Sequence, residues 1–282
     1  LGNVVTGVSL VVSPKIPTVA QILRRAGYAT CISGKWQLGY LGRAPDHPNR
    51  MGFDTYALWE WRDYENFKLT SCYGNPVIRR DGAILDGLED RFGPDVHAEF
   101  IIDHIREDRD RPWFVFYPMI LTHFPFVPPP ELWNEESPPE EAVGFPPNKG
   151  EPNYFPWMIR HMDGIIGRLF ATLEETDQLN DTLIVFLGDN GTDPAIRSSY
   201  HGRMVQGEKG ELTAGGCRVP LIVYQPSRFP AGAVVDAMVD VSDGFPTLLG
   251  AAGVNYEGHL DGRDLRKEVA QAPGTEADFS FS

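Results

Sequence analysis

Short runs of consecutive apolar residues alternate along the chain with longer segments in which apolar residues recur at helical spacing. Strand-length runs lie at about 29–33, 113–117, 183–187 and 221–224, and helical patterns lie at 17–27, 96–106, 158–173 and 243–252. Strands that are apolar at every position are typical of parallel strands buried on both faces. The pattern therefore predicts an α/β fold with a mostly parallel central sheet and helices on both faces.

The first helical segment also has the residues expected at its ends. Pro17 stands at its start, Arg24 and Arg25 fall in its last turn, and Gly27 follows. Proline early, cations late and glycine at the end are the usual boundaries of a helix. We expect a strand directly afterwards, and a glycine-bounded loop after that strand.

We expect residues 1–282 to form a single α/β domain. The stretch from about 125 to 156 is rich in proline and acidic residues, so it cannot hold a long helix or a strand ladder. We interpret it as an irregular excursion on the surface of that domain. A linker is the alternative.

Composition narrows the possible partners. With 39 acidic and 25 basic residues, the formal net charge is −14, which is the opposite of what a protein that binds a nucleic-acid backbone normally carries. No stretch approaches the roughly 20 apolar residues of a membrane span. The three cysteines, Cys31, Cys72 and Cys217, lie far apart and predict packing roles rather than a disulfide framework or a zinc site.

Polar clusters follow several of the predicted strands. In a parallel sheet, sites form beyond the carboxyl ends of the strands, so these clusters are expected to lie at one edge. They occupy residues 34–37 (GKWQ), 122–125 (THFP) and 188–191 (GDNG), the last being followed by 207–210 (GEKG).

The chemistry of these clusters fits a tetrahedral anion beside a metal. Asp189 and Asn190 offer hard oxygen ligands for Ca²⁺ or Mg²⁺, although an Asx turn uses the same residue types. Lys35 and Lys209 can hold an anion and offset charge on a leaving oxygen, although each alone could be a solvated lysine.

Histidines supply the candidate proton donor. His123 can protonate a leaving group, although a lone histidine is more often a packing or surface residue. We interpret His161 and His201 as structural residues.

Five ordered segments between about residues 17 and 265 resemble the sulfatase family of the alkaline phosphatase superfamily. Residues 26–39 (AGYATCISGKWQLG) resemble its second signature, G-Y-x-T followed by G-K-W-H-x-G. The others are 122–125 (THFP, like T-H-x-P), 186–191 (FLGDNG, like S-D-N-G), 207–220 (GEKGELTAGGCRVP, like G-K-G…E-G-G-x-R-V-P) and 241–253 (VSDGFPTLLGAAG, like D-x-x-P-T-L-L-x-x-A-G).

The resemblance implies an alkaline phosphatase-like fold and hydrolysis of a sulfate ester in a sulfated small molecule or glycan. It implies that Asp189 and Asn190 are ligands of a divalent metal, usually Ca²⁺. It implies catalytic roles for Lys35, Lys209 and His123 at the sulfate and the leaving oxygen. Gln37 stands where most relatives carry a histidine, and is expected to bind substrate by hydrogen bonds. Family habit points to a periplasmic or extracellular location.

The family's C-x-P-S-R motif, whose cysteine or serine becomes the formylglycine nucleophile, has no counterpart in this sequence. We therefore interpret the chain as an internal fragment whose N-terminal strand and C-terminal subdomain lie outside it. We do not expect this polypeptide alone to act by the family mechanism. A phosphodiesterase or phosphonate monoester hydrolase of the same superfamily is one alternative, and a non-catalytic sulfated-glycan-binding relative is another.

Overall fold

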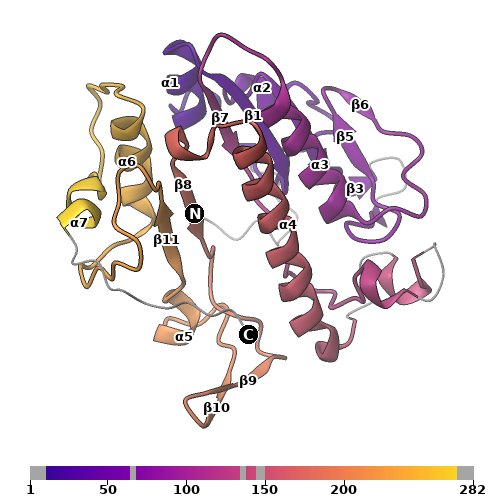
Figure 1. Ribbon diagram of the computed structural model, residues 1–282. Coiled ribbons are helices and arrows are strands. Elements are labelled where there is room, and N and C mark those ends of the chain that lie inside the picture. The colour runs from indigo at the N-terminus through magenta and orange to yellow at the C-terminus, as the bar shows by residue number, and fades with distance from the viewer. Residues whose placement is uncertain (1–10, 64–67, 134–137, 144–149, 272–282) are drawn as a thin grey trace. The chain divides into compact units, whose positions relative to one another are not determined.

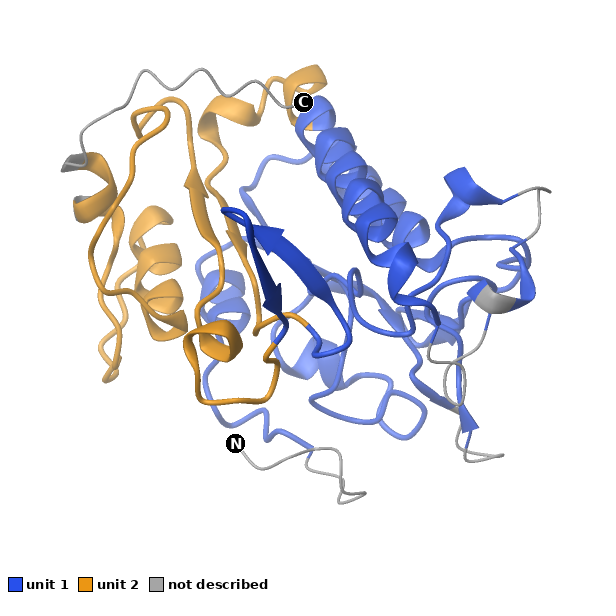
Figure 2. Ribbon diagram, turned by 90° about the horizontal axis from the view of Figure 1, so that it is seen from below, with its two compact units in different colours: residues 1–172, 193–207 blue, residues 173–192, 208–282 orange. Residues whose placement is uncertain are grey.

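The computed structural model describes residues 11–63, 68–133, 138–143 and 150–271 (Figure 1). The chain divides into two compact units, shown in Figure 2. Unit 1 comprises residues 1–172 and 193–207, and unit 2 comprises residues 173–192 and 208–282. The expectation of a single domain over 1–282 stays a prediction.

Unit 1 contains most of the secondary structure. Its helices are α1 (Val19–Arg25), α2 (His47–Arg50), α3 (Gly93–Arg106) and most of α4 (Phe155–Glu175), with short 3₁₀ turns at Pro130–Leu132, Glu140–Ala142 and Pro152–Tyr154. Its strands are β1 (Ala29–Gly34), β2 (Thr55–Trp59), β3 (Arg62–Asp63), β4 (Lys68–Leu69), β5 (Ile78–Arg80), β6 (Ala83–Ile84), β7 (Trp113–Phe116), β9 (Arg197–Tyr200) and β10 (Arg203–Gln206).

The central sheet of unit 1 has five strands in the order β6-β5-β2-β1-β7. β1 runs parallel to both of its neighbours, and Ile32 lies opposite Tyr56 on β2 and Phe116 on β7. β5 and β6 extend the sheet with antiparallel pairing. This core of parallel strands confirms the predicted α/β fold class.

Helices cover both faces of this sheet. Because consecutive strand residues point to opposite sides, neighbouring residues of β1 contact different helices. Ile32 packs with Ala20 of α1, whereas its neighbour Cys31 packs with Val96 and Phe100 of α3. All six residues of β1 are buried. The strand is therefore enclosed between two helical layers, as its apolar sequence predicts.

The ends of α1 confirm the expected boundaries. The Thr18 side chain accepts a hydrogen bond from the Gln21 amide, and the Gln21 side chain accepts one from the Thr18 amide, which forms a capping box. Gly27 follows the helix with φ of +96°, a conformation that favours glycine. The turn leads directly into β1.

Unit 2 is built around two strands, β8 (Ile184–Leu187) and β11 (Leu221–Tyr224). It also holds α5 (Ala214–Cys217), α6 (Gly244–Ala251), α7 (Arg266–Gln271) and 3₁₀ turns at Leu179–Asp181 and Val241–Asp243. Asp240 caps the last of these turns by accepting a hydrogen bond from the Ser242 amide at 2.7 Å.

The structure differs from the sequence prediction at two places. β8 and β11 pair with each other in antiparallel fashion, with Leu187 opposite Leu221, whereas their apolar sequences suggested parallel strands. Antiparallel neighbours need no crossover helix. The segment between the two strands, residues 188–220, contains β9, β10 and α5. The strands between 55 and 84 and the β9–β10 hairpin were not predicted. β3 to β6 are only two or three residues long, and β9 and β10 carry polar residues, whereas β2 (TYALW) is an apolar run of strand length that was missed.

The proline-rich stretch predicted at 125–156 begins and ends inside unit 1. Its residues 134–137 and 144–149 lie outside the described part of the chain. Phe126, Val127 and Ala142 are buried in the largest apolar cluster of the unit. Glu151 also donates its amide hydrogen to the Phe126 carbonyl at 2.8 Å, so the described parts of the stretch are packed onto the unit.

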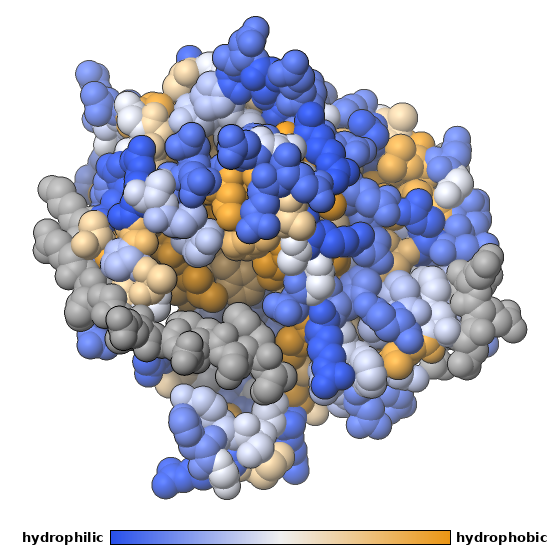
Figure 3. Space-filling view, in the orientation of Figure 1, coloured by the Kyte–Doolittle hydropathy of each residue, from blue (hydrophilic) through white to orange (hydrophobic). Residues whose placement is uncertain are grey.

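No helix in the described ranges is long and apolar enough to cross a membrane. Figure 3 shows hydrophilic residues over most of the visible face, with apolar residues gathered in smaller groups between them. The excess of acidic residues means that a site for an anion needs a local source of positive charge.

Candidate functional site

Lys35 lies directly beyond the carboxyl end of β1. Its amide donates a hydrogen bond of 2.8 Å to the carbonyl of Pro118, in the segment that follows the neighbouring parallel strand β7. Gly34 has φ of +123°, and a Cβ there would come within 2.3 Å of the Pro118 oxygen. Glycine is therefore needed for the two loops to approach each other.

The loop after Lys35 is held by its apolar side chains. Trp36 is buried, with its ring in edge contact with His47 at 5.4 Å and with Phe53 at 6.4 Å. Gln37, next along the chain, is exposed. The buried tryptophan thus fixes the backbone between the predicted catalytic lysine and the predicted substrate-binding glutamine.

His123 lies on the loop that follows β7, and its backbone is anchored on both sides. Its amide donates to the Ile120 carbonyl at 2.9 Å, and its carbonyl accepts from the Tyr73 hydroxyl at 2.6 Å. Its ring stacks on Phe124 with the centroids 4.5 Å apart. The side chain is partly exposed.

The hydrogen bond of the His123 ring assigns its tautomer. Nδ1 lies 2.7 Å from the Phe124 carbonyl oxygen, which can only accept. Nδ1 therefore carries a hydrogen, and Nε2 is the atom at which the ring gains or loses a proton. This arrangement suits a proton donor to a leaving oxygen.

Asp189 and Asn190 follow β8 in unit 2, between two backbone hydrogen bonds. Gly188 donates its amide hydrogen to Pro220 at 3.0 Å, and Gly191 donates to Gly216 at 2.9 Å. A Cβ on Gly191 would come within 2.0 Å of the Gly215 oxygen, so the turn packs closely against α5. Carboxylate and amide oxygens on such a turn are ligands that hard divalent cations prefer.

Lys209 lies on a loop that pairs with this turn. Its amide donates to the Thr192 carbonyl at 2.9 Å, two residues after Asn190. Glu208 beside it accepts a hydrogen bond from the Thr213 hydroxyl, and Thr213 caps α5. The structure therefore brings Lys209 close to the predicted metal ligands through the backbone.

The predicted site residues thus fall into two groups. The Lys35 and His123 loops meet at one edge of the central sheet in unit 1, where Gln37 follows Lys35. Asp189, Asn190 and Lys209 lie together in unit 2. Among the described residues, no three His, Cys, Asp or Glu side chains are clustered as a metal site requires.

A buried hydrogen-bonded pair, Ser33 and His97, lies next to the carboxyl end of β1. His97 Nδ1 lies 3.1 Å from the Ala57 carbonyl and 3.0 Å from Ser33 Oγ, one residue before Gly34. Burial lowers the pKa of His97 to about 4, so the ring is neutral at physiological pH. It acts as a hydrogen-bonding residue of the core.

Sequence reasoning missed a charged cluster between helices α3 and α4. His161 lies 3.2 Å from Asp95 and 2.7 Å from Glu131, and Arg168 pairs with the other oxygen of Asp95. Burial alone lowers the pKa of His161, but hydrogen bonds and charges from Asp95 and Glu131 outweigh it and raise the pKa. The partners are distant in sequence, so no local spacing could have indicated them.

Comparison with known proteins identifies relatives across nearly the whole chain. Residues 6–254 match the family described as Sulfatase. Mouse (Mus musculus) arylsulfatase G is 26% identical over 296 residues, covering 88% of this chain and 52% of the relative. Human (Homo sapiens) arylsulfatase A is 27% identical over 273 residues, covering 88% and 50%. The chain thus spans about half the length of these relatives.

Solved structures share the fold. Ps i-CgsB superposes with a TM-score of 0.73 at 22% identity, covering 93% of this chain and 59% of the other. A protein solved with its substrate D-glucosamine-2-N,6-O-disulfate superposes with a TM-score of 0.64 at 19% identity, covering 93% and 66%.

Proposed function

Because the chain belongs to the sulfatase family, we propose that it hydrolyses a sulfate ester of a sulfated saccharide. The observation that supports this most directly is the hydrogen bond between Lys35 and Pro118. It brings the lysine of one family motif and the loop of another to the same edge of the sheet. Sites of parallel sheets form at that edge.

Lys35 and Lys209 supply the positive charge that an acidic protein needs to bind sulfate. In our proposal their ammonium groups contact non-bridging sulfate oxygens and the leaving oxygen, where negative charge grows as the ester bond breaks. Gln37 donates a hydrogen bond to the substrate through its amide.

His123 is the proposed proton donor. With Nδ1 bonded to the Phe124 carbonyl, the protonated ring presents Nε2–H to the leaving oxygen and gives up that proton as the alcohol departs. The anchoring of its backbone by Tyr73 limits the motion of the ring.

Asp189 and Asn190 would hold a divalent cation, as the resemblance implies, and Ca²⁺ is the proposed ion. Their oxygen donors fit such an ion, although two side chains alone do not complete its shell. A bound cation supplies positive charge that stabilises anionic oxygens. The resemblance also implies a formylglycine nucleophile, and none of the residues assigned here takes that role.

Sulfated sugars are the proposed substrate class. One fold relative was solved with a glucosamine disulfate as its substrate and another with k-i-k-neocarrahexaose. Those ligands belong to those proteins, and they motivate testing sulfated glucosamine and carrageenan oligosaccharides here.

The test is turnover by the complete gene product, co-expressed with a formylglycine-generating enzyme. We expect release of sulfate from 4-nitrophenyl sulfate and from at least one of the two sulfated saccharide classes. Lys209→Ala and Asp189→Ala should each lower kcat/KM by about 100-fold or more. Lys68→Ala, an exposed lysine of β4, is the matched control and should leave it unchanged.

Other outcomes identify the alternatives. Faster hydrolysis of bis(4-nitrophenyl) phosphate than of any sulfate ester would favour a phosphodiesterase. Saccharide binding without turnover would favour a glycan-binding protein. Sulfatase activity that survives both Lys209→Ala and Asp189→Ala would reject the assigned site.

A further inference from the structure

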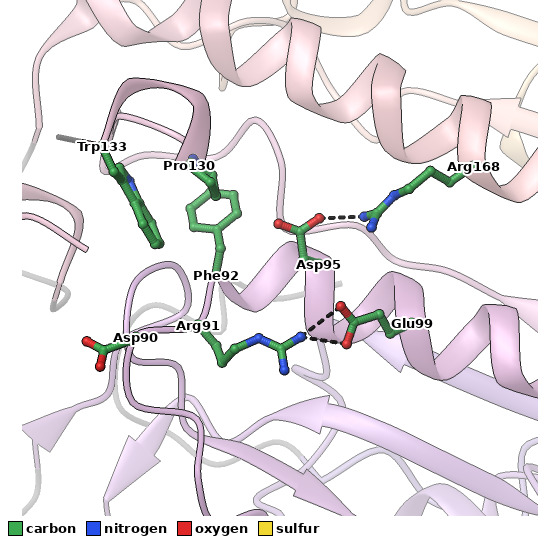
Figure 4. A pocket seen from close by; sticks show the side chains of 8 residues that line it. All are labelled: Asp90, Arg91, Phe92, Asp95, Glu99, Pro130, Trp133 and Arg168. Carbon is green, nitrogen blue, oxygen red and sulfur yellow. Dashed lines mark hydrogen bonds and ion pairs between the residues drawn. The ribbon is translucent and has the colours of Figure 1, made fainter. Parts of the chain in front are cut away.

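A wide-open cavity of about 490 Å³ lies on the surface of unit 1 beside the N-terminal end of α3. Figure 4 shows the side chains that line it, which come from the start of α3, the segment before it, the turn at 130–133 and helix α4. They are Asp90, Arg91, Phe92, Asp95, Glu99, Pro130, Trp133 and Arg168. Its volume is in the range of ligand sites.

One wall of the cavity is aromatic. Trp133 is partly exposed, and its Nε1–H donates a hydrogen bond to the Pro128 carbonyl at 3.0 Å, which fixes the indole. Its ring meets Phe92 edge to face, with the centroids 6.0 Å apart and the planes at 82°. A held, partly exposed indole offers an apolar surface on which the C–H face of a sugar ring can pack.

The charged groups of the cavity are paired. Arg91 binds the carboxylate of Glu99 through contacts of 2.6 and 2.7 Å, and Arg168 binds Asp95. Dashed lines mark both pairs in Figure 4. The pairs still present guanidinium N–H donors and carboxylate acceptors, which are the partners that hydroxyl groups need.

The charge balance argues against an anionic ligand. Three carboxylates, those of Asp90, Asp95 and Glu99, face two guanidinium groups in the lining. Next to the lining, His161 contacts both Asp95 and Glu131, and Glu131 lies in the 3₁₀ turn at 130–132. This pair adds one cation and one anion when both groups are charged. The cavity therefore carries no excess of positive charge and suits an uncharged polyol.

An aromatic contact chain connects the cavity to the His123 loop. Tyr73 stacks on Phe92 with the centroids 5.6 Å apart, and its hydroxyl donates to the His123 carbonyl at 2.6 Å. Phe92 in turn contacts the ring of Trp133. The wall of the cavity is therefore packed, through Tyr73, against the loop that carries His123.

We propose that this cavity binds an uncharged sugar ring of the saccharide whose sulfate is removed at His123. The inference rests on the proposed function, and it adds that the substrate is an oligosaccharide with an unsulfated ring next to or near the sulfated one. Trp133 packs on that ring, and the Arg91–Glu99 and Arg168–Asp95 pairs bind its hydroxyl groups.

Binding of neutral sugars tests the cavity without requiring catalysis. The full chain is titrated with three uncharged hexasaccharides, namely cellohexaose, chitohexaose and desulfated neocarrahexaose, and tryptophan fluorescence and calorimetry are recorded. We expect at least one to bind with a Kd of about 1 mM or tighter, with little dependence on salt. Trp133→Ala should weaken binding about tenfold.

Two further variants distinguish a loss of sugar binding from a folding defect. Glu99→Gln removes the exposed ion pair with Arg91 and should also weaken binding, with an unchanged melting temperature. Trp157→Ala, an exposed tryptophan of α4 outside the cavity lining, should bind as the wild type does.

Turnover separates this inference from the proposed function. In the active complete protein, Trp133→Ala should lower kcat/KM for a sulfated oligosaccharide about tenfold and leave 4-nitrophenyl sulfate unaffected. Neutral binding that depends on Trp133 in a protein without sulfatase activity would retain the cavity and reject the function. Failure of all three sugars to bind, or binding that Trp133→Ala and Glu99→Gln leave intact, would overturn the inference.

Discussion

The amide of Lys35 donates a 2.8 Å hydrogen bond to the carbonyl of Pro118, which joins the loops that follow two neighbouring parallel strands. The contact depends on Gly34, because any Cβ at this residue would overlap the Pro118 oxygen. The glycine that precedes Lys35 in the sequence is therefore required by a tertiary contact. The pairing positions both the candidate lysine and the His123 loop.

Gly34→Ala should separate these loops. The substitution adds a side chain at φ of +123° and 2.3 Å from a carbonyl oxygen, so we expect a loss of about 3 kcal/mol in the free energy of unfolding. Gly27→Ala is the control, since Gly27 also has positive φ but no atom within 4 Å of the added Cβ. It should cost only about 1 kcal/mol in urea denaturation. Equal losses for both would show that the contact with Pro118 is unimportant.

Calcium should stabilise the protein through Asp189 and Asn190. A ligand present at about 100 times its Kd adds about 2.7 kcal/mol, which corresponds to a rise in Tm of about 5 °C for a chain of this size. The measurement compares melting in EDTA with melting in excess Ca²⁺. Asp189→Ala should abolish the rise, whereas Asp181→Ala, an exposed acid of the same unit, should keep it. An equal rise in both variants would place the ion elsewhere.

The His161 cluster should make stability depend on pH. The pKa of His161 is raised in the folded state, so its contribution is complete below its unfolded pKa of about 6.5 and is lost as the pH rises through the folded pKa. The pKa of Asp95 is lowered, because His161 and Arg168 outweigh its burial, so its contribution fades only as the pH falls below about 3.8. The pairing is therefore strongest between about pH 4 and 6.5.

His161→Gln tests this pH dependence. The variant should lose about 2 kcal/mol at pH 5.5 and distinctly less at pH 8.5, measured by chemical denaturation. His259→Gln, which alters an exposed histidine, should change stability by less than about 0.5 kcal/mol at either pH. A loss for His161→Gln that does not vary with pH would mean that the ring acts only by packing.

The sequence predicted those elements whose pattern is local and strong. The capping residues and periodicity of α1, the long amphipathic pattern of α4 and the apolar run of β1 all indicate single structures, and the structure has them. The antiparallel pairing of β8 with β11 was not predictable, because an apolar run four residues long fits either direction. The short strands β5 and β6 gave no periodic signal.

In the candidate site, too, only the features with a local sequence pattern were predictable. Its residues were found because glycine-bounded polar loops follow apolar strands, and the Lys35 and Lys209 loops indeed make the backbone contacts described above. The His161 cluster and the cavity at Trp133 depend on side chains from α3, α4 and the 130–133 turn. Contacts between segments so far apart in sequence have no local pattern, so only the structure shows them.

The central claim is that Asp189, Asn190 and Lys209 of unit 2 form a site for a divalent cation and a sulfate group. It is tested most directly by a crystal structure of the complete protein with Ca²⁺ and a sulfated saccharide. We predict Nζ of Lys209 within about 3 Å of a sulfate oxygen, with the ion bound to Asp189 and Asn190. A sulfate bound away from Lys209, or an ion bound without Asp189 and Asn190, would contradict the account.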